Sequence, residues 1–160
     1  MMAVWTVYLS LCFLVALNAS EETHPVESKD CGECWLGWTA FGCKCFKYFS
    51  NQQTWAGAEK TCLDVNANLA SVHFREEYVF LQNLVIYETQ HTTRAWIGGH
   101  DAVEEGKWLW SDGTRMNFQI WSPGNPNNYA GTEHCLEMNY DDGNWNDDKC
   151  SEFKPFVCAY

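Results

Sequence analysis

The sequence predicts an α+β domain in which two helices are combined with small antiparallel sheets and a long loop, stapled together by disulfides. Three observations support this fold class. Two stretches with helical patterning precede the short β-like runs of the second half of the chain, and cysteines recur from Cys31 to Cys158. The segment between Ser111 and Glu133 is rich in Gly, Asn and Pro and lacks regular periodicity, which is typical of a functional loop in a compact domain.

The N-terminal residues 1–20 predict a secretory signal peptide. They carry no charged side chain, and their apolar middle, Val4 to Leu17, is too short to span a bilayer comfortably. An uncleaved anchor is the alternative. We expect a signal peptide at 1–20, a mobile leader at 21–33 and one extracellular domain at 34–160.

The charge of the chain excludes one class of partner. The formal net charge is −11 and none of it lies in the first twenty residues, so nucleic acid is a poor partner for the mature surface. No later apolar run is long enough for membrane insertion. Acidity suits a surface that collects cations, although most acidic secreted proteins are merely soluble.

The cysteine count indicates disulfides. Removing the signal peptide removes Cys12, so nine cysteines become eight, an even number. A zinc site is the competing use, but the paired spacings of a zinc ribbon are absent and the secretory compartment oxidises thiols. Eight thiols allow roughly a hundred pairings, so the count alone assigns none of them.

The elements follow from local patterns. Aromatic residues alternate with turn glycines over residues 34–49, which predicts a hairpin closed by a disulfide. Thr54 is a helix N-cap and places Cys62 near the end of a first helix. A second helix is expected from about Arg75 to Val85, opened by two glutamates. Its buried face would carry Tyr78, Leu81, Leu84 and Val85.

Four short β-like runs follow the helices, and the tryptophans within WIGG and WLW are expected to pack in the core. The runs are AWIGG (95–99), KWLW (107–110), CLEMN (135–139) and KPFVC (154–158).

A series of landmarks in a fixed order extends over most of the chain. They are Cys34 and Cys45 with the intervening GW, LASVHFREE (69–77), WIGG (96–99), WLWSDGT (108–114), NPNNYAGTEHC (125–135) and NWNDDKC (144–150). Together these motifs resemble the C-type lectin-like domain family over residues 34–158.

The resemblance implies the disulfides Cys34–Cys45, Cys62–Cys158 and Cys135–Cys150. Cys31 and Cys43 are then left to pair with each other or with another chain, and the sequence leaves both alternatives open. A homo-oligomer, disulfide-linked or non-covalent, is therefore allowed.

The resemblance also implies a calcium site in the long loop. By position, its ligands are Asn125, Asn127, Glu133, Asn146 and Asp147. Ca²⁺ takes six to eight oxygens and mixes carboxylates, amide oxygens and backbone carbonyls, so the residue types suit the ion. A cis bond at Pro126 would turn both neighbouring amides to one side.

The same five residues are implied to bind carbohydrate, since calcium ligands in this family also hydrogen-bond two vicinal sugar hydroxyls. The resemblance thus implies a secreted lectin for microbial or host glycans, with a role in innate immunity. Related domains use Glu-Pro-Asn for mannose-type and Gln-Pro-Asp for galactose-type sugars. This chain has Asn125-Pro126-Asn127 instead, which removes one carboxylate from the site and leaves the choice of sugar open. Tyr129 would either stack on a sugar or lie solvated in the loop.

Some relatives hold an auxiliary calcium, and Asp101 and Glu105 stand at two positions of that site. Asn128 and His134 replace two of its other acids, and the alternative for Asp101 and Glu105 is a charged loop rim.

An enzyme is not predicted, because the histidines are scattered and no Ser or Cys lies in a nucleophile motif. The alternative function is a member of the same fold that binds no sugar and instead binds protein, like a toxin, or ice. Ice binding favours a flat, Thr-rich patch, and the loop offers only Thr114 and Thr132.

Overall fold

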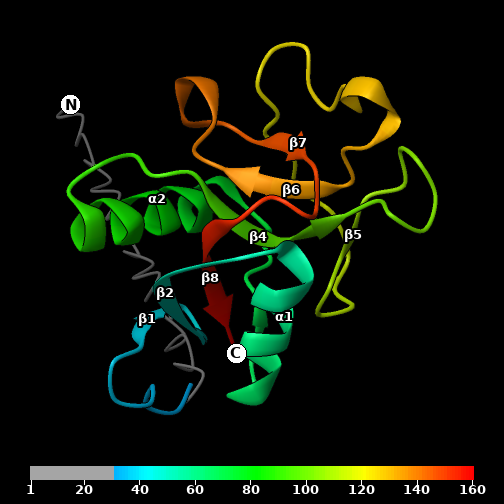
Figure 1. Cartoon of the computed structure of the whole chain (residues 1–160). Helices are drawn as coiled ribbons and strands as arrows, with labels where there is room; N and C mark the ends of the chain where they lie inside the picture. Colours follow the sequence, from blue (N-terminus) through cyan, green and yellow to red (C-terminus); the bar gives the residue numbers. More distant parts are fainter. Residues whose placement is uncertain (1–30) are drawn as a thin grey trace, which may run out of the picture.

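The computed structural model describes residues 31–160. The predicted signal peptide and residues 21–30 of the predicted leader lie outside the described residues. The predicted fold class is confirmed, because two α-helices are combined with one β-sheet (Figure 1). The elements are β1 (Thr39–Phe41), β2 (Lys44–Gln53), α1 (Trp55–Asp64), β3 (Asn68–Leu69), α2 (Arg75–Thr89), β4 (Ala95–His100), β5 (Leu109–Trp110), β6 (Cys135–Met138), β7 (Asn146–Asp148) and β8 (Lys154–Ala159).

The strands form one sheet and not the separate small sheets that the sequence predicts. Its order is β1-β2-β8-β4-β6-β7, with β3 beside β8 and β5 beside β4. The pairs are antiparallel except β4 and β8, which run parallel and meet at Trp96 and Phe156. This parallel contact joins the strands near the chain ends to the strands that carry the long loop. Figure 1 shows β6, β7 and the long loop at the end of the molecule opposite β1 and the C-terminus.

The predicted hairpin is β1 and β2, which pair antiparallel with Ala40 opposite Cys45. Four disulfides staple the described residues. They join Cys31 to Cys43, Cys34 to Cys45, Cys62 to Cys158 and Cys135 to Cys150. Three of these pairs are those that the family resemblance implies, and the fourth places Cys31 and Cys43 within one chain.

Helix α1 begins where its cap predicts. The hydroxyl of Thr54 accepts the N–H of Gly57 at 3.2 Å, which satisfies one of the free donors of the first turn. Ala58 and Cys62 are fully buried, and the disulfide from Cys62 fastens the helix to β8.

Helix α2 is four residues longer than the pattern predicts. The four predicted core residues are buried, but Ile86 and Tyr87 in the extra turn are exposed, so they gave no periodic signal. The C-cap is Gln90, whose N–H still donates to the carbonyl of Ile86 at 2.7 Å and whose left-handed backbone turns the chain out of the helix. Glu77 is buried rather than solvated, and it pairs with Lys44 at 3.0 Å.

The predicted core tryptophans are confirmed, since Trp96, Trp108 and Trp110 are buried. Trp145 is also fully buried, and the rings of Tyr78, Trp110, Phe118 and Trp121 meet it edge to face. This aromatic cluster links α2, β5 and the long loop, so the loop leaves the sheet from a rigid base.

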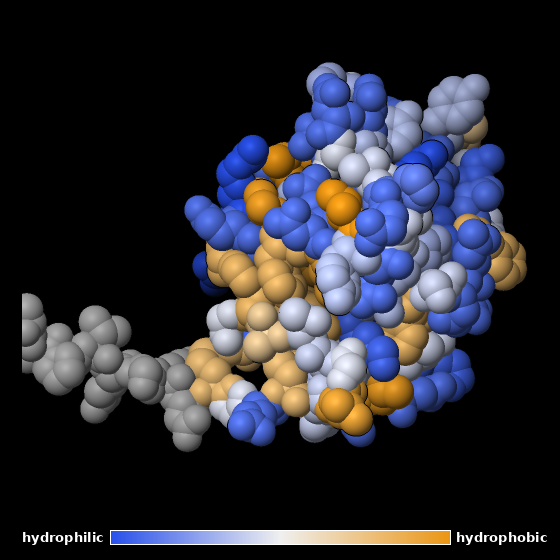
Figure 2. All heavy atoms as spheres, turned by 90° about the vertical axis from the view of Figure 1, so that its left-hand side faces the viewer, coloured by the Kyte–Doolittle hydropathy of each residue, from blue (hydrophilic) through white to orange (hydrophobic). Residues whose placement is uncertain are grey.

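The outer surface of α2 retains some apolar exposure. Val79, Ile86 and Tyr87 lie on it, and a shallow groove beside the helix is lined by Thr39, Phe80, Asn83, Leu84 and Tyr87. Figure 2 shows the side of the molecule that lies to the left in Figure 1, where apolar patches alternate with hydrophilic ones.

Candidate functional site

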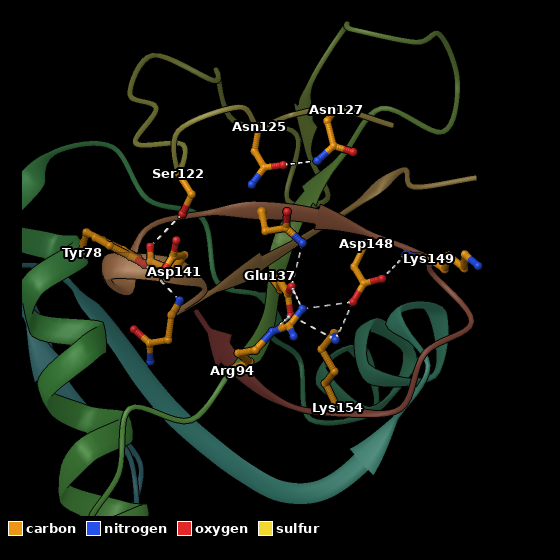
Figure 3. Close-up of polar contacts among 12 residues, drawn as sticks. Tyr78, Arg94, Ser122, Asn125, Asn127, Glu137, Asp141, Asp148, Lys149 and Lys154 are labelled. Atoms are coloured by element: carbon orange, nitrogen blue, oxygen red, sulfur yellow. Dashed lines mark hydrogen bonds and ion pairs between the residues drawn. The ribbon is translucent and has the colours of Figure 1, made fainter. Parts of the chain in front are cut away.

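The long loop returns to the sheet and is fixed against the start of β7. Trp121 and Trp145 form a β-bridge, and the N–H of Ser122 donates to the carbonyl of Trp145 at 2.8 Å. The hydroxyl of Ser122 donates to the carbonyl of Asp141 at 2.8 Å (Figure 3). This anchoring brings the next turn of the loop to the edge of β7.

The turn after Ser122 presents the two asparagines that flank Pro126. The bond between Asn125 and Pro126 is cis, as expected from the resemblance. The amide nitrogen of Asn127 donates to the amide oxygen of Asn125, so the two side chains lie together above β7 (Figure 3). Two amide groups are thereby gathered at one point of the loop.

Asp147 on β7 fixes this turn in place. Its carboxylate oxygens accept the backbone N–H of Asn127 at 3.0 and 2.9 Å, and one oxygen also accepts the N–H of Asn128 at 2.6 Å. The side chain is fully buried, yet among residues 31–160 no Lys or Arg forms an ion pair with it. Backbone N–H groups satisfy this carboxylate but do not neutralise its charge, so it suits a cation ligand.

The hairpin of β6 and β7 sets the position of both strand ligands. Leu136 lies opposite Asp147 and Glu137 opposite Asn146, and the Cys135–Cys150 disulfide closes the pair. Because successive side chains alternate between the faces of a strand, Asn146 and Asp147 point to opposite faces of β7. They meet different partners: Asp147 meets the loop backbone, whereas Asn146 meets Glu137.

Glu133 closes the loop side of the site. One carboxylate oxygen accepts the N–H of Tyr129 at 3.0 Å, and the backbone N–H of Glu133 donates to the amide oxygen of Asn128 at 3.0 Å. Partial burial and the nearby carboxylates of Asp147 and Asp148 raise the pKa of Glu133, although the Tyr129 bond opposes this. A cation at this place would relieve the repulsion.

A layer of paired charges lies beneath the turn (Figure 3). Fully buried Glu137 pairs with Arg94 and, at 3.0 Å, with Lys154, while Asp148 pairs with Lys154 at 2.7 Å. Glu137 also accepts the amide nitrogen of Asn146 at 2.9 Å. This bond fixes the amide of Asn146 and leaves its oxygen for another partner.

An open pocket of about 420 Å³ connects these groups. It is lined by Arg94, Asn127, Tyr129, Glu133, Tyr140, Asn146 and Asp148. Tyr129 is 71% exposed at its rim, and the guanidinium of Arg94 lies 4.8 Å from the ring centre of Tyr140. A pocket that is open and mostly polar suits a hydrophilic ligand.

The five residues selected from the sequence therefore belong to one neighbourhood. Asn125 contacts Asn127, Asn127 is held by Asp147, and the pocket brings Asn127, Glu133 and Asn146 together. Three amide groups and two carboxylates match the oxygen chemistry that calcium prefers, so the residues fit that ion.

Sequence reasoning missed the residues that support these ligands. Arg94, Glu137, Tyr140, Asp148 and Lys154 were not selected. A usable signal existed for Glu137, because a charged residue within the apolar run CLEM must find a partner once the strand is buried.

A second group of side chains lies at the start of β6, next to Glu133. Asp101, Glu105 and His134 bring ligand atoms within 4.8 Å of one another. The alternative that Asp101 belongs to an exposed, charged loop rim is wrong. Asp101 is only 2% exposed, because the turn that follows β4 folds over it.

The model of the lectin C-type domain matches residues 51–160. The chain belongs to the C-type lectin domain family. Two curated members are 37% identical to this C-type lectin chain. They are ladderlectin of Oncorhynchus mykiss, covering 96% of this chain and 92% of that protein, and the galactose-specific lectin nattectin of Thalassophryne nattereri, covering 97% and 94%.

A similar solved structure is that of an antifreeze protein and not of a lectin. A calcium-independent type II antifreeze protein superposes with a TM-score of 0.72 at 31% identity, over 80% of this chain and 94% of that one. The family thus includes lectins and ice-binding proteins on one fold. The prediction that the chain is no enzyme agrees with its place in this non-enzymatic family. Within residues 31–160, no helix has the length and apolar character needed to cross a membrane.

Proposed function

We propose that the chain is a secreted, calcium-dependent lectin that binds terminal mannose-type or galactose-type sugars on microbial or host glycans. The observation that carries this proposal is the Asn125–Asn127 turn held on the carboxylate of Asp147, next to a pocket that contains Glu133 and Asn146. A fold that needed only to close a loop would not require two carboxylates and three amides to gather where the loop meets β7.

The ion would be held by Asn125, Asn127, Glu133, Asn146 and Asp147. Calcium at this place would supply open coordination positions for two vicinal hydroxyls of a sugar ring. The side chains would then use their remaining capacity on the same hydroxyls, with amide nitrogens donating and carboxylate oxygens accepting. Only a ring with matching hydroxyl stereochemistry would satisfy both requirements, which is the basis of specificity.

The rim of the pocket supports a sugar ligand. Tyr129 offers an exposed aromatic face beside Asn127, and the apolar side of a sugar ring packs well on such a face. An open site of this size holds a single sugar weakly. Useful avidity would therefore come from several domains that act together, either as an oligomer or on a clustered glycan.

The test is retention on immobilised mannose and immobilised galactose in calcium, followed by elution with a chelator. Glu133→Gln keeps an oxygen that can accept the Tyr129 N–H but removes the charge, so we expect calcium affinity to fall about ten-fold or more and retention to be lost. Asp142→Asn is the matched control, because this carboxylate is exposed and lies outside the donor set.

Wild-type protein that stays on the column in the chelator, or calorimetry that detects no calcium uptake at millimolar concentrations, would overturn the proposal. A glycan array with and without calcium would then define the preferred sugar.

Ice binding is the second candidate, and its support is the likeness to the antifreeze protein. The loop offers few free threonine hydroxyls for an ice-binding surface. The hydroxyl of Thr114 donates to Asp112 at 2.5 Å, and the hydroxyl of Thr132 donates to the carbonyl of Tyr129 at 3.2 Å, so both are already engaged within the chain. A thermal-hysteresis measurement decides between the two functions, since a lectin without ice affinity shows none.

A further inference from the structure

A mixed cluster of one imidazole and two carboxylates lies where β4 ends and β6 begins. His100 on β4 pairs with Cys135 on β6, so the next residue of one strand faces the preceding residue of the other. These two residues are Asp101 and His134, and the N–H of Asp101 donates to the carbonyl of His134 at 3.1 Å. Their side chains are therefore positioned by the sheet and not by a mobile loop.

The turn after β4 adds the third side chain. One oxygen of Asp101 accepts the N–H of Gly106 at 2.8 Å, which folds the segment 102–106 back over the strand end. Glu105 is thereby brought to the same ring nitrogen that faces Asp101. The Nδ1 of His134 lies 3.1 Å from Asp101 Oδ1 and 3.4 Å from Glu105 Oε2.

These separations suit a small divalent ion. Zinc bonds to nitrogen and oxygen of about 2.0–2.2 Å in a tetrahedron imply ligand atoms about 3.3–3.6 Å apart. The two distances from His134 are already close to this value. The Glu105 side chain is 55% exposed, so it can complete the geometry without disturbing the core.

The charge of the cluster points the same way. Asp101 is buried, and among residues 31–160 its ionic partner is His134 rather than a Lys or Arg. Lys107, the basic residue next to Gly106, pairs with Glu104 instead. Two carboxylates without a permanent cation would be neutralised by one divalent ion.

We propose that Asp101, Glu105 and His134, which stand where some relatives hold an auxiliary calcium, instead bind a transition-metal ion such as Zn²⁺. Imidazole nitrogen is a good ligand for zinc, whereas calcium selects oxygen, so His134 determines the class of metal. The side-chain ligands number three, which leaves a fourth position for water. All eight cysteines among residues 31–160 are in disulfides, so no thiolate there competes for the ion.

The site adjoins the loop that carries the proposed calcium ligands but shares none of them. The amide nitrogen of Asn128 donates to Glu105, and its amide oxygen accepts the N–H of Glu133. An ion held by Glu105 would therefore also fix Asn128, at the root of the sugar-binding loop.

The test uses the full secreted protein, stripped with a chelator and then saturated with calcium so that the proposed sugar site is filled. Zn²⁺ is titrated by calorimetry, and Co²⁺ is titrated by visible absorption as a spectroscopic substitute. We expect one equivalent of either ion to bind, with a Co²⁺ spectrum that indicates nitrogen and oxygen ligands.

Three variants locate the ion. His134→Ala should weaken zinc binding about a hundred-fold, and Glu105→Gln, which changes an exposed side chain, should weaken it about ten-fold. His91→Ala removes an exposed histidine from another turn and should change nothing. Circular dichroism shows whether each variant is folded.

Wild-type protein that binds no Zn²⁺ or Co²⁺ in excess calcium would overturn the proposal, and so would binding that Glu105→Gln and His134→Ala leave unchanged. Either result would mean that Nδ1 of His134 only donates hydrogen bonds to the two carboxylates. Because calcium uptake and sugar retention are measured separately, failure here is distinguishable from failure of the proposed lectin function.

Discussion

The two halves of the molecule are held together by different forces. In the half that contains α1, α2, β2 and β8, apolar side chains are buried between regular elements. In the half that contains residues 122–134 and 139–144, side chains hydrogen-bond to the backbone in place of regular strand pairing.

This difference shows how an irregular loop can still have a defined shape. The turn at Asn127 is held by two oxygens of Asp147, and the turn at Gly143 is held by Tyr78 and Gln82. Each polar contact is individually modest, but a buried polar group left without its partner costs about 1–3 kcal/mol, so the contacts form together. The loop half is therefore specific in shape but more sensitive to charge and pH.

The largest expected effect on the free energy of unfolding comes from removing one disulfide in each half. Cys62–Cys158 spans 96 residues and Cys135–Cys150 spans 15. Chain-entropy arguments give about 4.7 kcal/mol for the longer loop and about 3 kcal/mol for the shorter one. We expect urea unfolding of the paired Cys→Ala variants to show this order.

Removing Cys135–Cys150 should also reduce calcium uptake, because it loosens the hairpin that carries Asn146 and Asp147. The reverse order of stabilities would contradict the chain-entropy argument, and unchanged calcium uptake would show that this disulfide does not position β7.

The next effect isolates apolar packing. Leu81 is fully buried on α2, so Leu81→Ala should lower the free energy of unfolding by about 3 kcal/mol. Val79→Ala on the exposed side of the same helix is the control, with an expected change of about 0.5 kcal/mol or less. Equal effects of the two changes in urea unfolding would show that α2 is not packed as described.

A smaller effect on stability tests the hydrogen bonds by which Tyr78 connects the two halves. The hydroxyl of Tyr78 donates to the carbonyl of Gly143 at 2.6 Å and accepts the N–H of Asn139 at 3.2 Å. Burial raises the pKa of this phenol well above its usual value, so it stays neutral. Tyr78→Phe should cost about 1–2 kcal/mol in thermal or urea unfolding.

The matched control for Tyr78→Phe is Tyr87→Phe, since Tyr87 is 77% exposed on the same helix. We expect no measurable change there. If both variants behaved alike, the hydroxyl of Tyr78 would not connect α2 to the turn.

The smallest effect depends on pH and concerns the start of the loop. Burial acts to raise the pKa of Asp112, but hydrogen bonds from Ser71 and Thr114, together with Lys44, outweigh it and hold the pKa below its usual value. A depressed carboxyl pKa contributes stability above the unfolded-state pKa, and this contribution is lost as the pH falls through the folded-state pKa.

Asp112→Asn should therefore cost about 1 kcal/mol near neutral pH, and the difference from wild type should shrink in acid. Asp142→Asn, which changes an exposed carboxylate, is expected to show no such dependence. A difference at Asp112 that stays constant down to low pH would point to packing instead of charge.

Several elements could be predicted because their signals are local. Thr54 caps α1 through a contact three residues away, and the buried face of α2 follows helical spacing. The end of α2 was misjudged because Ile86 and Tyr87 are exposed. The strand runs were located, but β5 is shorter than predicted, since only Leu109 and Trp110 reach β4.

The site was predictable only in part. The family resemblance implied Asn125, Asn127, Glu133, Asn146 and Asp147 by their positions in the motifs, and their oxygen-bearing side chains suit calcium. Nothing local indicated that Asp147 would accept backbone N–H groups twenty residues away, or that Arg94 and Lys154 would neutralise Glu137 beneath them.

The sequence by itself predicted the family, the cysteines available for pairing, most of both helices and the candidate donor residues, because these depend on residue type, motif order and short spacing. The tertiary structure decided which donors meet. It joined the strands through the parallel contact of Trp96 with Phe156, set the loop against β7, and placed His134 beside Asp101. The physical reason is that burial and strand register act between residues far apart in the chain, where local patterns carry no information.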